Sequence, residues 1–538
     1  MRHDKLLQTI TLCCLMLALR LTTAEAQTAI WTGATGGEWN TPGNWDIGVP
    51  GVGTNALINV ARVVNYTQPM ISGSFAGLTN LSGTLNINTN GFMLTASGTS
   101  AVLFYGAGKM YITNGGVMGV TNGGMVLTSN STTTVSAGGS FTVKNTLAVG
   151  MYGNSSGGGG AGFFTNNAGI ISLGGLTVNN GSGNQTCLAV INGGTNDLGA
   201  VTVQRSAASS APALGAEGLV INSGVVRTTS IDVGGGSGNS WLSMYLKDGF
   251  LTNAGNFTVR FGNTAGRFSR FVQAGGILVS TNTSVHLRGQ TGANNGWVQY
   301  SVTGGTNLVG GFVISDTGDV HSSVFLTNNA KIYIGSGGFS MGGILDATNV
   351  ALNGNGIFGA LADWTGTVPM IINGGTMDAA DLDGNAHNIT IAGSLRGTGT
   401  LTKTGAGTLT LSGANSQSGG LTINAGTLAL VNDGATTFGA LASSPITVGS
   451  GANLDVSQAN GFVLASSKTI AGVGTITGAF AAGSNSIISP AGIGAQGKLT
   501  FASGLAATNA NFKMELGSDP TGLITANDSV NVTGDLTL

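Results

Sequence analysis

The chain has 538 residues, of which only 7% are charged although 41% are apolar, and its formal net charge is −2 at pH 7. Globular chains are usually about 25% charged and about 7% glycine, whereas this chain contains 94 glycines. The near-neutral charge argues against a nucleic-acid partner, which requires a basic surface, and the apolar content is too high for a disordered chain.

Residues 1–26 have the features of a secretory signal peptide. Basic residues at the start precede the apolar run LLQTITLCCLMLAL, and the small-x-small sequence ending at Ala26 predicts cleavage before Gln27. A membrane anchor is the weaker alternative, because this run of about 14 residues is shorter than the ~20 that a spanning helix needs. We expect no membrane span in the mature chain, and no internal disulfide, because only Cys187 remains after cleavage.

Residues 27–65 form a tryptophan-rich segment with Trp31, Trp39 and Trp45. The ends of a repetitive β-structure must be covered, so these rings predict an N-terminal cap. A platform on which sugars stack is the less favoured alternative.

Residues 66–395 contain a degenerate repeat. A bulky residue before a polar, glycine-containing corner recurs every 25–30 residues, which is typical of a solenoid. The residues heading these repeats are Phe164, Val190, Val220, Tyr245, Phe271, Tyr300 and Phe325. Stacking of these residues on their counterparts one coil away predicts an internal ladder. Propeller blades need about 40–50 residues, and connections between parallel strands are right-handed, so we expect an all-β fold, a right-handed parallel β-helix with coils of about 20–30 residues.

Asp378, Asp381 and Asp383 form the densest acidic group. A calcium loop of the EF-hand type needs glycine at its sixth position and an acid at its twelfth, and a loop that begins at Asp381 has neither. Catalytic carboxylate pairs on a β-helix would have to lie about 5–10 Å apart, and no acidic pair recurs at the coil period. A polar corner is therefore the favoured interpretation, with calcium binding left open and no catalytic, cofactor or metal residue predicted.

Residues 399–430 are the most regular stretch. Leucine or isoleucine alternates with threonine, as at Leu409 and Leu411, so each segment has one apolar and one hydroxyl-bearing face. Glycine and asparagine interrupt the alternation and indicate tight corners. Four short strands within about thirty residues are too few for an independent domain, so this unit must stack on neighbouring coils.

This stretch, within residues 396–435, resembles the autotransporter-associated β-strand repeat of bacterial surface proteins. The matching positions are Lys403, Gly405, Gly407, Leu409, Leu411, Gly413, Asn415, Ser418, Gly419, Gly420, Gly426 and Leu428. The family usually has an aromatic residue where Gln417 stands. The segments 31–58 and 512–538 are also similar to parts of such proteins. The resemblance implies a secreted or surface-displayed β-solenoid with no reaction assigned to the repeat.

Residues 436–538 are expected to form the C-terminal coils of the solenoid, truncated at Leu538 before a further strand or a translocator. The resulting prediction is an exported, non-enzymatic, adhesin-like scaffold, secreted or held at the surface of a Gram-negative-type envelope. Its expected partners are surface glycans or other cell-surface proteins, and it is expected to be a monomer without a cofactor. The alternative is a polysaccharide-active β-helix enzyme or a carbohydrate-binding module.

Overall fold

A computed structural model describes residues 27–69, 74–88, 91, 93–99, 102–150, 161–180, 187–205, 218–234, 241–260, 268–288, 296–315, 320–342, 350–431, 444–459, 461–492, 494–517 and 527–538. The predicted signal peptide, and with it cleavage after Ala26, lies outside these residues. Within these ranges, no helix is long and apolar enough to cross a membrane.

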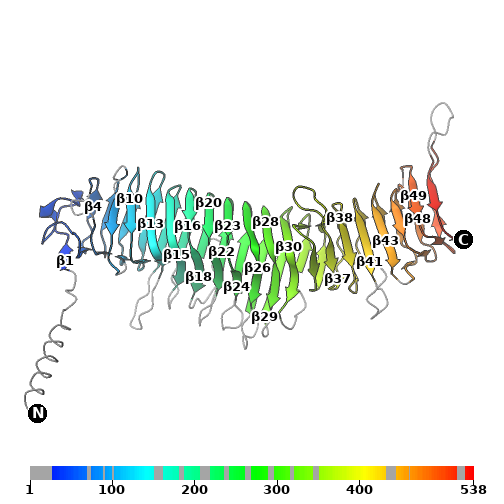
Figure 1. Ribbon diagram of the computed structural model, residues 1–538, viewed down its shortest axis with the longest axis horizontal. Coiled ribbons are helices and arrows are strands. Elements are labelled where there is room, and N and C mark those ends of the chain that lie inside the picture. The colour runs from blue at the N-terminus through cyan, green and yellow to red at the C-terminus, as the bar shows by residue number, and fades with distance from the viewer. Residues whose placement is uncertain are drawn as a thin grey trace, which may run out of the picture.

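The described chain is a β-solenoid in which strands of successive coils stack along one long axis (Figure 1). A typical coil has three strands, and each pairs in parallel with its counterpart in the next coil. We call the three sides face 1, face 2 and face 3, and the chain visits face 3, then face 1, then face 2. Faces 1 and 2 are joined by long strands that bend around their shared corner.

The strands are distributed over these faces as follows. Face 1 contains β7 (Met93–Ala96), β10 (Val117–Val120), β17 (Thr195–Asp197), β20 (Val225–Thr228), β23 (Phe250–Asn253), β32 (Ile357–Ala360), β35 (Gly375–Asp378), β38 (Leu401–Thr404), β40 (Leu421–Ile423), β42 (Ile446–Val448), β45 (Thr469–Gly472), β48 (Ile487–Pro490) and β51 (Asn511–Phe512). Face 2 contains β1 (Gln27–Ile30), β3 (Thr54–Ile58), β5 (Gly77–Asn80), β8 (Val102–Phe104), β11 (Met125–Leu127), β18 (Ala200–Arg205), β21 (Ser230–Gly234), β24 (Phe257–Arg260), β33 (Trp364–Gly366), β36 (Ile389–Ile391), β39 (Thr408–Leu411), β41 (Thr427–Val431), β43 (Asn453–Gln458), β46 (Thr475–Thr477), β49 (Lys498–Phe501) and β52 (Ser529–Val532). The strands that span both faces are β13 (Ser140–Val149), β15 (Ile170–Asn180), β26 (Ile277–Arg288), β28 (Thr306–Ser315) and β30 (Lys331–Met341). Face 3 contains β2 (Gly37–Glu38), β4 (Val63–Tyr66), β6 (Thr84–Ile87), β9 (Lys109–Ile112), β12 (Ser131–Ser136), β14 (Gly162–Asn167), β16 (Leu188–Ile191), β19 (Gly218–Ile221), β22 (Trp241–Leu246), β25 (Phe268–Gln273), β27 (Gly296–Val302), β29 (Val320–Leu326), β31 (Val350–Asn353), β34 (Met370–Asn373), β37 (Leu395–Arg396), β44 (Val463–Leu464), β47 (Phe480–Ala482), β50 (Leu505–Ala506) and β53 (Leu536–Thr537).

The register between coils confirms the all-β, parallel fold, and on face 2 the 16 separate strands and the five spanning strands pair in one series of 21 described strands. Paired residues on face 3 are 25 residues apart at Phe164 and Ala189, and 30 apart at Ala189 and Leu219. On face 1 the spacing falls to 20 residues between Leu401 and Leu421. The right-handed sense of the coil stays a prediction.

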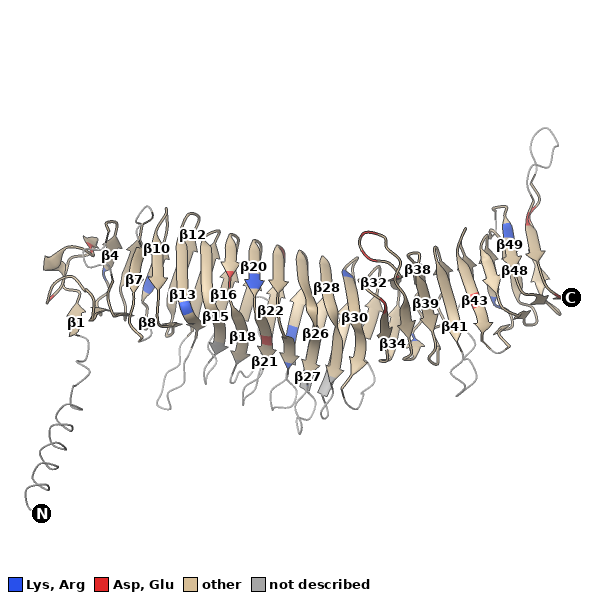
Figure 2. Ribbon diagram, viewed as in Figure 1, with Lys and Arg blue, Asp and Glu red and all other residues tan. Residues whose placement is uncertain are grey.

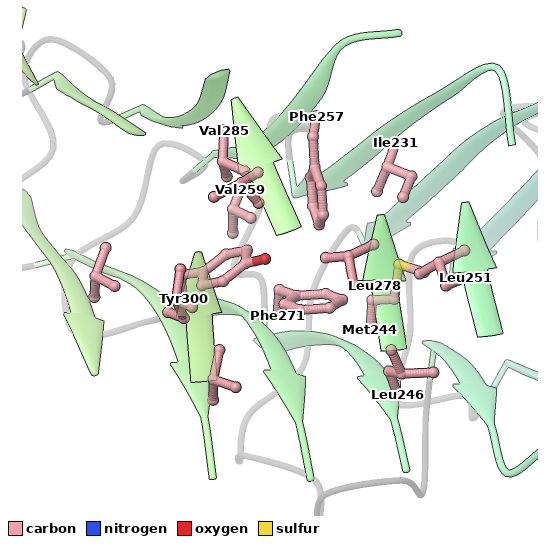
Figure 3. Packing of buried hydrophobic residues seen from close by; sticks show 14 of the residues in the cluster. Ile231, Met244, Leu246, Leu251, Phe257, Val259, Phe271, Leu278, Val285 and Tyr300 are labelled. Carbon is pink, nitrogen blue, oxygen red and sulfur yellow. The ribbon is translucent and has the colours of Figure 1, made fainter. Parts of the chain in front are cut away.

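An apolar core runs along the inside of the solenoid. Side chains alternate between inside and outside, as in β12, where every second residue is buried. Phe271 and Tyr300 are both fully buried and stack with ring centroids 4.8 Å apart (Figure 3), and Phe257 packs edge-on against Phe271 at 5.1 Å. The predicted internal ladder is therefore present in these coils.

The predicted register of that ladder is wrong by one residue in four of its seven repeats. Val190, Val220, Tyr245 and Phe325 share an outward-directed row, and the inward positions beside them are taken by Ala189, Leu219, Met244 and Val324. The inward four are fully buried, whereas Tyr245 and Phe325 are only partly buried. The prediction assigned the bulky residue of each repeat to the interior, but the larger residue of the adjacent apolar pair faces outward in three of these four repeats.

The three tryptophans cover the N-terminal end of the core. Trp31, Trp39 and Trp45 are 1%, 0% and 4% exposed, and Trp45 packs edge-on against both other rings at 5.1 and 4.8 Å. The Trp45 Nε1–H donates a hydrogen bond to the Trp39 carbonyl oxygen at 2.7 Å. This burial leaves no ring face open to a sugar, which contradicts the stacking-platform alternative.

Candidate functional site

The repeat at 399–430 forms strands β38, β39, β40 and β41, as the sequence predicts. Leu409, Leu411 and Leu428 are at most 1% exposed, while Thr408 and Thr410 point outward from the same strand. Leu409 pairs with Leu428 one coil later. Alternating leucine and threonine therefore give this coil a dry interior and a hydroxyl-bearing exterior.

Close packing explains most, but not all, of the glycines in the repeat. Gly426 has φ of +64°, which L-residues rarely adopt. A Cβ at Gly419 would lie 2.1 Å from the Gly399 carbonyl oxygen of the preceding coil, whereas a Cβ at Gly420 would meet nothing closer than Thr400 Oγ1 at 3.4 Å. Carbonyls of the preceding coil also approach Gly407 and Gly413. Gly420 is thus the motif glycine that neither backbone conformation nor space requires.

Lys403 points into the core. It is 0% exposed, and its Nζ donates hydrogen bonds to the carbonyl oxygens of Thr404, Gly405 and Ala425 at 2.8, 2.8 and 3.0 Å. Burial lowers the pKa of Lys403 to about 8, and the nearby Asp378 carboxylate opposes this shift. Because Ala425 belongs to the following coil, Lys403 joins the same corner of two coils.

Two buried amides replace the strand of face 3 in this coil. Asn415 and Gln417 are 5% and 3% exposed. The Asn415 Oδ1 accepts a hydrogen bond from the Leu395 N–H at 3.2 Å, and the Gln417 Nε2 donates to the Gly399 carbonyl oxygen at 2.6 Å. Gln417 therefore occupies an inner position with an amide where the resemblance leads us to expect an aromatic ring.

The acidic residues lie at the corner between β35 and β36 (Figure 2). Asp378 accepts hydrogen bonds from the Tyr333 and Thr404 hydroxyls at 3.2 and 3.0 Å. Asp381 accepts bonds from the backbone N–H groups of Asp383 and Asn385 and from the Asn385 side chain. Hydrogen bonds from Asn385 hold the pKa of Asp381 below its usual range.

These contacts describe a polar corner in which the protein itself binds the carboxylates of Asp378 and Asp381. The imidazole of His387 lies 3.6 Å from Asp381 and 3.8 Å from Asp363. Among the described residues, no group of three or more histidine, cysteine or acidic side chains could hold a metal ion. Asp378 and Asp381 thus bind different partners at this corner, and the described residues do not assemble a metal site from them.

Sequence reasoning placed Lys403 in the repeat but missed its role as a buried link between coils. The signal was present, because Lys403 is two residues after Leu401 on the same strand and therefore shares its inward face. The inward positions of Asn415 and Gln417 carried no comparable signal, because no strand alternation extends over 412–420.

Comparison with known families identifies a stretch of two successive coils. Residues 397–430 match the passenger-associated-transport-repeat family, which confirms the resemblance predicted from 399–430. No curated protein and no solved structure matches the chain.

Proposed function

We propose that the chain is an exported, autotransporter-passenger-like β-solenoid that serves as a non-enzymatic, adhesin-like scaffold at the cell surface or after release. The observation that carries this proposal is the match at 397–430 to a passenger-associated repeat. In the structure this repeat spans two successive coils, because β38 pairs with β40. It is continuous with the rest of the solenoid, because β38 also pairs with β35 before it and β40 pairs with β42 after it.

The shape and surface of the molecule support an extended scaffold. At about 4.8 Å per coil, the 21 strands paired in succession on face 2 extend roughly 95 Å. Thr402, Thr422 and Thr447 lie in one outward row on face 1, and each is partly exposed. Such hydroxyl rows offer hydrogen bonds to surface glycans or to other cell-surface proteins, which are the proposed partners.

Export is tested by expressing the chain with its own leader in a Gram-negative host. The expected product begins at Gln27 and is degraded when intact cells are treated with protease. A matched variant with Ala24 and Ala26 both changed to leucine should retain the leader. A product that keeps Met1 and stays inside the cells would contradict the proposal.

Activity is tested by incubating purified protein with neutral and uronic-acid polysaccharides. We expect binding without any new reducing ends or unsaturated products. Turnover that disappears in Asp381→Asn or Asp383→Asn would support the alternative of a polysaccharide-active enzyme.

A further inference from the structure

Face 1 carries an outward row of apolar residues that the proposed scaffold role does not explain. Strand register places eight residues of successive coils in this row: Ile170, Thr195, Val225, Phe250, Ile277, Thr306, Lys331 and Ile357. Ile170, Phe250 and Ile277 are 59%, 39% and 40% exposed. Of the described residues between 110 and 340, these three are the exposed large apolar ones.

The row is accessible because glycines flank it. Gly224, Gly249, Gly276 and Gly305 each precede a member of the row and adopt positive φ. A Cβ at any of these glycines would come within 3 Å of the backbone of the preceding coil. The glycines are therefore required by packing, and they leave no side chains beside Phe250 and Ile277 on that edge.

A second outward row lies two residues further along each strand. In coil order its accessible members are Asp197, Arg227, Thr252, Val279 and Leu308, whereas the next member, Tyr333, is 4% exposed and lies outside the accessible surface. Arg227 Nη1 lies 3.2 Å from Asp197 Oδ1, and both side chains are more than half exposed. The charged end of this row thus lies on one side of Phe250, while Val279 and Leu308 lie on the other side.

We propose that these two rows form the contact surface for a second copy of this chain. Two solenoids pack side by side through face 1 and run in opposite directions, with a twofold axis along the strand direction between Phe250 and Ile277. This symmetry places Phe250 against Ile277, Val225 against Thr306 and Ile170 against Ile357. The centre of the surface is self-complementary, as a twofold contact requires, because Phe250 meets Ile277 in the first row and Thr252 meets Val279 in the second.

Charge selects the antiparallel arrangement. A parallel pair with its twofold axis along the first row would place Lys331 opposite Lys331, and like charges directly opposed are destabilising. A parallel pair with its axis between the two rows would leave Lys331 of one copy five coils away from Asp197 of the other. Reversal of one copy places Lys331 opposite Thr195 and next to Asp197. In this position Lys331 of one copy shares the Asp197 carboxylate of the other with Arg227. The polar ends of the rows therefore complement each other only when the copies run in opposite directions.

The size of the surface indicates a reversible contact. Eight coils span seven steps of about 4.8 Å, or ~34 Å, and the two rows are about 7 Å apart along the strand. This area is below the ~800 Å² per partner of a standard stable interface. We therefore expect a monomer in dilute solution and a dimer as the concentration rises.

Sedimentation velocity of the purified mature chain over a concentration series tests the contact. Phe250→Asp should weaken dimerisation by roughly tenfold or more, as expected for a central apolar contact. Leu382→Asp is the matched control, because Leu382 is 51% exposed on the acidic corner outside the rows. Circular dichroism shows whether both variants remain folded.

A chain that stays monomeric at the highest soluble concentration, or a dimer that Phe250→Asp leaves unchanged, would overturn the proposal. Binding of purified glycans to this face by a purely monomeric chain would overturn it as well.

Cross-linking tests the direction of packing. A short bis-maleimide should link a mixture of Val225→Cys and Thr306→Cys chains into dimers, and it should link neither variant alone. The native Cys187 is 2% exposed, and cross-linking of the unsubstituted chain measures how much dimer arises through this cysteine. Efficient linking of Val225→Cys to itself would overturn the antiparallel arrangement. The experiment uses purified protein, so its outcome is independent of export and of the scaffold role.

Discussion

The coils around Phe271 and the two coils at 397–430 share one backbone plan but fill it differently. Phe271 and Tyr300 belong to coils in which paired residues lie 29 apart, whereas Leu409 and Leu428 lie 19 apart. The longer coils contain stacked aromatic rings and a buried polar group, in which Asn307 Nδ2 donates to the Tyr300 hydroxyl at 2.7 Å. The shorter coils contain leucines and the buried Lys403.

This contrast shows that core filling and corner contacts can vary while the pairing of strands is maintained. In the coils around Phe271, where all three faces contain a strand, stacked aromatic rings fill the core. The smaller leucine interior accompanies a coil in which 412–420 replaces the face 3 strand. In both regions a polar side chain binds corner backbone: Gln273 Nε2 donates to the carbonyl oxygens of Gly276 and Thr306 at 3.2 and 3.1 Å, as Lys403 does at its own corner. These bonds stabilise the place where the strand ends, because a buried carbonyl without a donor costs free energy.

Phe271→Ala should give the largest difference between the two regions. Loss of a buried aromatic ring typically costs about 3–5 kcal/mol, and in a solenoid the effect falls on neighbouring coils. Hydrogen exchange should therefore accelerate in described residues between 245 and 325 and remain slow in 399–430. Phe250→Ala is the matched control, because Phe250 is 39% exposed. Equal acceleration in both regions would mean that the chain unfolds as one unit.

Lys403→Met should destabilise the shorter coil by about 2 kcal/mol. The substitution removes a costly buried charge, but it leaves three corner carbonyls without their donor, and an unsatisfied buried group costs about 1–3 kcal/mol. Exchange should accelerate in 399–430 and stay unchanged around Phe271. Unaltered protection in 399–430 would show that Lys403 does not join the two coils.

The same lysine predicts a pH dependence. Its pKa is lowered from 10.5 to about 8 in the fold, so between these values the unfolded chain binds more protons than the folded one. The stability of this coil should therefore rise as the pH increases from 8 to 10.5, by at most roughly 3 kcal/mol. Hydrogen exchange corrected for intrinsic rates measures this gain, which Lys403→Met should lack.

Gly419→Ala and Gly420→Ala compare two adjacent glycines of the motif. The added methyl at Gly419 would collide with the Gly399 carbonyl, and overpacking of this kind typically costs about 1–3 kcal/mol. At Gly420 the added methyl has ordinary contacts, so its effect should be within about 0.5 kcal/mol. Hydrogen exchange in 399–430, measured for both variants at increasing denaturant concentration, tests whether Gly419→Ala destabilises more than Gly420→Ala. A reversal would show that Gly420 has a role unrelated to space.

The smallest effect is expected at the acidic corner. EDTA and added calcium should leave the melting temperature unchanged, because backbone and side-chain donors already occupy Asp381. Asp381→Asn keeps the shape of an acceptor and should cost less than about 1 kcal/mol. A calcium-dependent rise in melting temperature that Asp381→Asn abolishes would revive the calcium interpretation.

The sequence was sufficient to predict the class of fold, the coil length and the positions of Phe271 and Tyr300. These features depend on alternation and on a period of 25–30 residues, which are visible in one chain. The inward register failed where two apolar residues are adjacent, as at Ala189 and Val190, because alternation alone does not distinguish the face of either residue.

The contacts within the candidate site were less predictable. Lys403 could have been placed inside by its spacing from Leu401, but its three carbonyl partners belong to corners of two coils. Sequence spacing does not determine which corners of successive coils lie together, because 412–420 has no alternating pattern that would give the register between the coils. The same limit applied to Gln417, whose partner at Gly399 is brought near by stacking.

The stacking of coils also determines how the molecule responds to a pulling force. Hydrogen bonds between strands of successive coils lie along the long axis (Figure 1), so tension applied between the two ends loads them one coil at a time. Each detached coil of about 20–30 residues would release roughly 65–100 Å of extended chain. We therefore expect a series of small rupture events in single-molecule force measurements, and a solenoid that lengthens stepwise under load before it breaks its connection.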